Sequence, residues 1–213
     1  MSIHETINQA QPGQTQLGQV QSDQARSFEK IIAEYETPDL GQRHQVLDTT
    51  FKANPSEAMT LDEAHTTSDN VPGNVHLYTK VTPGDHGHEP ISVGTHSKVG
   101  GNHDFANPGE ILCAAIAACY DSSIRMVSCR LGIDLLGLSV KVIGNVDVRG
   151  TLKLDKTVPT AFQGFDVVVD INAGPAVDEG LVKAILNAAE ESCVVMQTLL
   201  QSPPIAVEHR IAG

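Results

Sequence analysis

The chain has 213 residues, a formal net charge of −12 and only 4% aromatic residues, none of them tryptophan. A chain this negative repels polyanions and offers few rings for base stacking, so nucleic acid and anionic membranes are poor partners. The length suits one large domain, or one domain with an extension. No apolar run approaches the roughly 20 residues of a membrane span, and the N-terminus does not resemble a signal peptide. We therefore expect a cytoplasmic protein.

The N-terminal part of the sequence differs in composition from the rest. Residues 1–25 contain seven glutamines and little apolar material, which predicts a mobile Gln-rich arm. Apolar residues then recur at helical spacing and predict a short helix over 25–36. The stretch 40–53 is ambiguous and is broken at Asn54-Pro55. We expect an arm at 1–25, a helical extension at 26–60 and the main domain at 61–213.

The middle of the chain combines strand patterns with one long apolar helix. Alternation over 75–81 and 91–93, with glycine-containing turns between, predicts antiparallel strands. Residues 107–110, Asn-Pro-Gly-Glu, have the composition of a helix start, because Asn can cap the first turn and Glu can complete a capping box. The helix should run to about Leu131 and end at Gly132.

The C-terminal part predicts strands over 138–148 and 165–171, a helix over 178–190, and a final strand over 205–211. Residues 193–200 are either a third helix or the continuation of the helix over 178–190. Helices and strands are segregated rather than alternating, which indicates an α+β fold. The long helix is apolar over most of its circumference, so one small sheet cannot cover it. We therefore expect a homodimer with two such helices packed centrally, where close contact is allowed by Ala114, Ala115, Ala117 and Ala118.

Four cysteines in a chain of this length do not form a disulfide scaffold, and none is spaced as Cys-x-x-Cys. Cys119 lies midway along the alanine-rich helix, and Cys193 opens a second apolar run. If folding brings them together, the pair can cycle between dithiol and disulfide. The alternative for either cysteine is a small buried hydrophobe, which is the interpretation we favour for Cys113 and Cys129.

Several segments together resemble the family of osmotically inducible protein C (OsmC) and organic hydroperoxide resistance protein (Ohr). They are residues 107–112, 114–119, 131–133, 144–150 and 190–199. The resemblance spans about residues 70–210, and the longer N-terminus is similar to that of an extended OsmC-like subgroup. It implies an OsmC-like fold, with small antiparallel sheets around long central helices, in an intertwined homodimer with active sites at the dimer interface.

The resemblance also implies an activity, the thiol-dependent reduction of organic hydroperoxides without a bound cofactor. Cys119 corresponds to the cysteine that attacks the peroxide and Cys193 to the cysteine that resolves the product. An external dithiol would be the second partner, since it must restore both thiols. The family's glutamate lies ten residues before the attacking cysteine, where this chain has Gly109. Glu110 lies about 180° round the helix from Cys119, so it is either a helix cap or a displaced catalytic group.

An attacking thiol must be ionised, and in a buried site this requires a nearby cation. The family's activating Arg should precede the helix, yet residues 52–123 contain no Arg. Lys98 is the nearest basic residue, and Arg43 can reach in from the extension. Because Lys lacks the guanidinium fork, a second hypothesis stays open: a non-catalytic OsmC-fold dimer that binds a small apolar or electrophilic ligand.

A third and weaker hypothesis is a metal site in the loops before the long helix. His86, His88, His96, His103 and Asp104 gather there in the sequence. No pair of these histidines has the spacing of a zinc site. We therefore interpret them as exposed loop residues and predict no metal.

Overall fold

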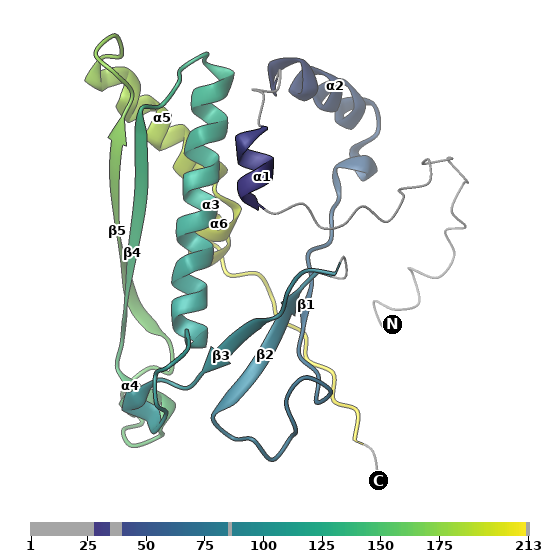
Figure 1. Ribbon diagram of the computed structural model, residues 1–213, viewed down its shortest axis with the longest axis vertical. Coiled ribbons are helices and arrows are strands. Elements are labelled where there is room, and N and C mark those ends of the chain that lie inside the picture. The colour runs from purple at the N-terminus through teal and green to yellow at the C-terminus, as the bar shows by residue number, and fades with distance from the viewer. Residues whose placement is uncertain (1–27, 35–39, 85–86, 212–213) are drawn as a thin grey trace. The chain divides into compact units, whose positions relative to one another are not determined.

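The computed structural model describes residues 28–34, 40–84 and 87–211 (Figure 1). The chain divides into two compact units, Met1–Asp39 and Leu40–Gly213. In the first unit the described element is a short helix, α1 (Phe28–Ala33), inside the segment predicted as helical. The Gln-rich arm at 1–25 lies outside the described residues.

The second unit begins with α2 (Leu40–Ala53), so the ambiguous stretch is a helix. Lys52 pairs with Asp48 at 2.7 Å, an i,i+4 arrangement that stabilises an exposed helix. The helix ends at the predicted break, because the residue before a proline disfavours helical backbone. A single turn of 3-10 helix, η3 (Pro55–Ala58), follows.

A small antiparallel sheet comes next, in the order β1 (Ala64–His65), β2 (Tyr78–Pro83) and β3 (Ile91–Gly94). Both predicted strands are present, although the first begins at Tyr78 rather than at residue 75. The left-handed backbone of Gly84, with φ +65°, turns the chain at the end of β2. A 3-10 turn, η4 (Ser97–Val99), leads from this sheet towards the long helix.

The long helix is α3 (Pro108–Arg130), and its predicted start is confirmed. The Asn107 side chain accepts hydrogen bonds from the amides of Gly109 and Glu110, and the Glu110 carboxylate accepts the Asn107 amide at 2.9 Å. This is a capping box. Gly132, with φ +69°, follows the helix end as expected.

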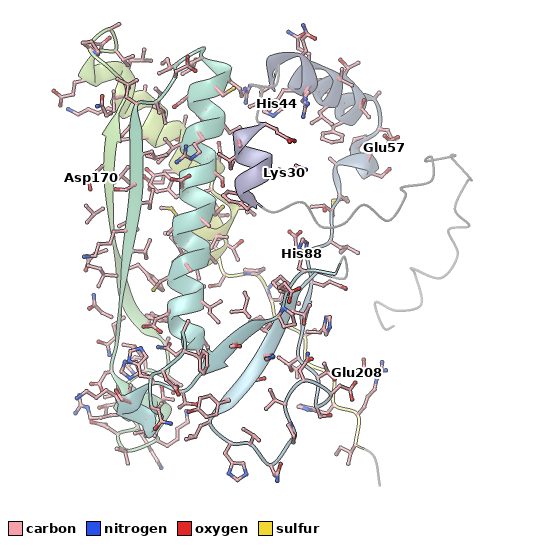
Figure 2. All side chains as sticks on the ribbon, in the orientation of Figure 1. Lys30, His44, Glu57, His88, Asp170 and Glu208 are labelled. Atoms are coloured by element: carbon pink, nitrogen blue, oxygen red, sulfur yellow. The ribbon has the colours of Figure 1, made fainter. Side chains whose placement is uncertain are left out.

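Two long antiparallel strands, β4 (Gly137–Val146) and β5 (Phe162–Asn172), form a second sheet beside α3 (Figure 1). β4 ends earlier than predicted, at a register shift after Asn145, because Asp147 caps the short helix α4 (Val148–Thr151). β5 begins at Phe162 rather than at residue 165. Its alternation leaves Asp170 exposed on the outer face, as Figure 2 shows.

The chain ends with two helices, α5 (Glu179–Ser192) and α6 (Val194–Leu200), both close to the predicted ranges. They pack on α3, which also contacts β4. The buried core between these elements is formed by Tyr120, Ile124, Ile185, Ala189 and Cys193.

Two expectations from the sequence need correction. The predicted strand over 205–211 is wrong, because residues 202–211 form no strand and Ile205, Val207 and Ile211 are exposed. Alternation favours a strand only when one face is covered. Also, by length and composition alone, α3 is the one helix of the described chain that could span a membrane. One face of this helix, with Ile116, Tyr120 and Ile124, is buried.

Candidate thiol site

The fold brings together the two cysteines that the sequence singles out. Cys119 is half-buried on α3 and packs against the core cluster that contains Cys193. Cys193 is fully buried at the junction of α5 and α6. All four cysteines are free thiols. Cys119 and Cys193 are neighbours because α5 and α6 both pack on α3, so the junction between them lies against the long helix.

The backbone at the junction explains how Cys193 is presented. Its extended backbone, φ −77° and ψ 98°, ends α5 and caps the start of α6. The Cys193 amide donates to the Glu190 carbonyl at 3.2 Å. The side-chain amide of Gln197 donates to the same carbonyl at 3.1 Å. The chain therefore bends at Cys193 while both flanking helices stay connected.

The surroundings of Cys193 favour the protonated thiol. Burial raises the pKa of Cys193 most, and the neighbouring Cys119 thiol raises it further. The backbone amides of Met196 and Val195 favour the thiolate and lower the pKa of Cys193, which offsets part of the rise. Within the described part of the second unit, no Lys or Arg is hydrogen-bonded to Cys119.

Tyr120, next to Cys119, connects the two helices that carry the thiols. Its ring is 6% exposed, and its hydroxyl donates to the Leu186 carbonyl of α5 at 3.2 Å. Burial raises the pKa of Tyr120, and the charges of Glu190 and Cys193 add to this. A protonated hydroxyl thus holds α3 to α5 close to the thiols.

Glu110 lies at the N-terminal end of α3. The Asn107 amide and the ring of His103, whose Nε2 lies 2.9 Å from Glu110 Oε1, lower the pKa of this carboxyl. His103 also stacks on His96, with 4.4 Å between ring centroids. The structure therefore assigns Glu110 an observed capping role.

An open groove of about 1450 Å³ lies beside the helix start, between the β2–β3 hairpin and the end of β4. Lys98, Glu110 and Cys113 line it, whereas Cys119 does not. A rise of 1.5 Å per residue places Cys119 about 14 Å along the helix from Glu110. Within one chain, Lys98 and Glu110 thus lie at the same groove as Cys113, away from Cys119 and Cys193.

The sequence pattern predicts Cys113 in the core, but its side chain is half-buried and lines the groove. The spacing of three residues between Glu110 and Cys113 indicates this position, because residues i and i+3 share a helix face. Arg43, the other candidate cation, is exposed on α2. In the described structure it has no hydrogen bond to either thiol of the pair.

The histidines before α3 do not assemble a metal site in the described chain, where no group of three or more potential ligands is suitably placed. The His96 ring accepts the Lys98 amide at 3.0 Å, and His103 faces Glu110. His86 lies outside the described residues.

These features define an α+β protein in which two free thiols, one on a long helix and one at a helix junction, meet in the core. The chain belongs to the OsmC-like family, whose model, described as OsmC-like protein, matches residues 101–208. A search of curated proteins finds no match to the sequence.

Solved structures share the fold. An OsmC-like protein of unknown function from Vibrio cholerae is 11% identical over 66% of this chain and 94% of its own, with a TM-score of 0.53. An OsmC-like protein from Mycoplasma pneumoniae is 14% identical over 67% and 89%, with a TM-score of 0.52. An organic hydroperoxide resistance protein from Legionella pneumophila is 19% identical over 66% of this chain and 90% of its own, with a TM-score of 0.49. The family match and the two structures with TM-scores above 0.5 confirm the expected α+β, OsmC-like fold.

Proposed function

We propose that this protein reduces organic hydroperoxides through the thiols of Cys119 and Cys193. The observation that carries the proposal is the meeting of these thiols in the core, at positions distant in the sequence. Membership of the OsmC-like family adds support, since the resemblance implies this activity. The half-buried Cys119 is the accessible member of the pair, which suits the attacking role.

The proposed reaction has three balanced steps. The Cys119 thiolate attacks the distal peroxide oxygen, the O–O bond breaks, and the alkoxide takes a proton to leave as an alcohol. The Cys193 sulfur then attacks the sulfenic acid of Cys119, forming a disulfide and releasing water. An external dithiol reduces this disulfide through a mixed disulfide and becomes oxidised itself. No bound cofactor takes part in this scheme, and a reducing cytoplasm would supply the dithiol.

The thiol pair needs a cation, which we propose comes from a second copy of the chain. The face of α3 that carries Ala114, Ala115 and Ala118 is exposed, so a second helix can approach it closely. The resemblance implies an intertwined homodimer, and the exposed alanines favour its formation through this face. In it, Lys98 and Arg43 of the other copy are the candidate cations that stabilise the Cys119 thiolate. Glu110 of the other copy is the candidate that orients the peroxide.

The test is turnover of cumene hydroperoxide with a dithiol reductant. Cys119→Ser should abolish turnover, because an alcohol of ordinary pKa does not replace a thiolate. Cys193→Ser should remove disulfide formation and slow turnover, while Cys113→Ser is the matched control on the same helix and should retain activity. Equal rates for the wild type and Cys119→Ser would exclude Cys119 from the mechanism.

A second candidate function is non-catalytic binding of a small apolar or electrophilic ligand. The groove favours it, because Lys98, Glu110 and Cys113 line a large open space away from the thiol pair. Thiol titration before and after one equivalent of hydroperoxide separates the two functions. The enzyme should lose two thiols per chain, whereas a binding protein should lose none.

A further inference from the structure

Gln197 bonds to both sides of the chain bend that presents Cys193. Its backbone amide donates to the Cys193 carbonyl at 2.9 Å, the first hydrogen bond of α6. Its side-chain Nε2 donates to the Glu190 carbonyl at 3.1 Å, in the last turn of α5. The Gln197 side chain is half-buried, and its Oε1 accepts from Gln201 Nε2 at 3.3 Å.

The contact with Glu190 matters because α5 stops at Ser192. The last carbonyls of a helix have no partner in the next turn, so a side chain that reaches one of them sets where the chain can go. The Glu190 carbonyl also accepts the Cys193 amide. Both donors therefore act on one acceptor, and together they fix the angle between α5 and α6 at the cysteine.

The direction of Cys193 depends on this angle. Its sulfur is fully buried and lies beside Cys119, with α5 anchored to α3 through Tyr120 and Leu186. Forming a disulfide requires the sulfurs to close to about 2.05 Å with a restricted dihedral angle. A bend held in one geometry keeps Cys193 at a high effective concentration for Cys119, whereas a loose bend lowers it.

We infer that Gln197 is a positioning residue for the resolving thiol, and that its amide bond to the Glu190 carbonyl holds Cys193 in register with Cys119. The inference rests on the proposed function, since it assigns a role within the same thiol pair. Among the described residues, the hydrogen bonds of Gln197 go to the carbonyls of Cys193 and Glu190 and to Gln201, and none goes to a sulfur, so it acts through the backbone of the junction. It sets both the rate of disulfide closure and the stability of the disulfide.

The experiment measures the Cys119–Cys193 disulfide directly in the full-length protein. Wild type and Gln197→Met are equilibrated in buffers of reduced and oxidised dithiothreitol, and alkylation with peptide mapping separates the pair from Cys113 and Cys129. Met keeps the length of the side chain but has no donor. We expect the equilibrium constant for disulfide formation to fall about tenfold, about 30 mV for a two-electron couple. Closure after one equivalent of cumene hydroperoxide should slow by a similar factor.

The matched control is Gln201→Met, which removes the neighbouring amide and leaves the bond between Gln197 and Glu190 in place. It should keep the wild-type potential. A residue that only stabilises the fold would lower the stability of the reduced and oxidised proteins equally, so the potential separates positioning from stability. Gln197→Glu is the second variant if Gln197→Met does not fold, because its carboxylate keeps the shape but cannot donate.

The outcomes divide clearly. An unchanged potential and closure rate in both Gln197 variants, with a normal wild-type disulfide, would overturn the positioning role and leave the proposed function intact. If the wild type forms no Cys119–Cys193 disulfide in oxidising buffer, the proposed redox function fails and this role fails with it.

Discussion

The surroundings of Cys193 favour its protonated thiol, so the stability of the fold should depend on pH in the alkaline range. The pKa of Cys193 in the folded chain is raised above that of the unfolded chain, mainly by burial. The folded state therefore keeps a proton that the unfolded state loses at alkaline pH. The stabilisation is fully present below the unfolded pKa, near 9, and is lost as pH rises through the folded pKa.

We accordingly expect the free energy of unfolding, measured with urea under reducing conditions, to decline from about pH 9 upward. Cys193→Ser should show a shallower decline, because serine does not titrate in this range. Cys113→Ser keeps Cys193 in place and should follow the wild type. Parallel curves for the wild type and Cys193→Ser would show that burial of this thiol does not govern the alkaline limb.

Tyr120 provides the second residue-scale prediction. Tyr120→Phe keeps the ring in the core but removes the donor to the Leu186 carbonyl. A hydrogen bond of this kind contributes about 1 kcal/mol, so the free energy of unfolding at pH 7 should fall by about that amount. The loss should shrink above pH 10, because the raised pKa of Tyr120 stabilises the wild type only below that range. A variant as stable as the wild type at pH 7 would refute the link between α3 and α5.

At the scale of elements, the start of α3 shows how a capping carboxylate depends on pH. The pKa of Glu110 is lowered, chiefly by the Asn107 amide, so its stabilisation is present above the unfolded pKa near 4.5 and lost as pH falls through the folded value. Because the side chain is half exposed, we expect Glu110→Ala to cost only about 0.5 kcal/mol at pH 7. The difference from the wild type should shrink as pH falls below 4.5.

The same variant also tests the alternative role of Glu110. If Glu110 acts only as a cap, Glu110→Ala should keep hydroperoxide turnover at temperatures where it stays folded. Glu110→Gln is the matched control, because glutamine preserves the reach of the side chain and can still complete a capping box. A loss of turnover in both variants without loss of stability would assign Glu110 to the reaction instead.

How far the sequence predicts an element depends on where its determinants lie. The start and length of α3 follow from Asn107, Glu110 and the apolar run itself, which are local, and the structure confirms them. The segment 205–211 also alternates, but a strand needs a partner, and the described chain supplies none there. The position of Cys113 at a groove depends on the distant β2–β3 hairpin, which no local pattern reveals.

The candidate site divides in the same way. The proximity of Cys119 and Cys193 was expected from the resemblance, because a distant pair has no signature in local spacing. The junction between α5 and α6, which carries Cys193, includes a hydrogen bond from the Gln197 side chain back to the Glu190 carbonyl. That contact depends on the break between α5 and α6, which the sequence left open as either a new helix or a continuation.

At the scale of the whole molecule, the main question is what covers the outer face of α3. The core side of this helix holds Ile116 and Ile124 at 2% and 0% exposure, while Ala114, Ala115 and Ala118 are exposed. Small residues allow two helices to approach closely, and a charge among them would be buried without a partner on association. The proposed homodimer through this face should therefore be sensitive to single substitutions.

We expect Ala118→Glu to dissociate the proposed dimer, because the carboxylate is solvated in a free chain but desolvated between two helices. Sedimentation velocity of the full-length protein should show the wild type as a dimer and Ala118→Glu as a folded monomer. Ala184→Glu, at an exposed alanine of α5, is the matched control and should stay dimeric. Since we place the activating cation in the second copy, the monomer should also lose hydroperoxide turnover while retaining the Cys119–Cys193 disulfide. A dimeric Ala118→Glu, or a monomeric one with full activity, would contradict the shared site.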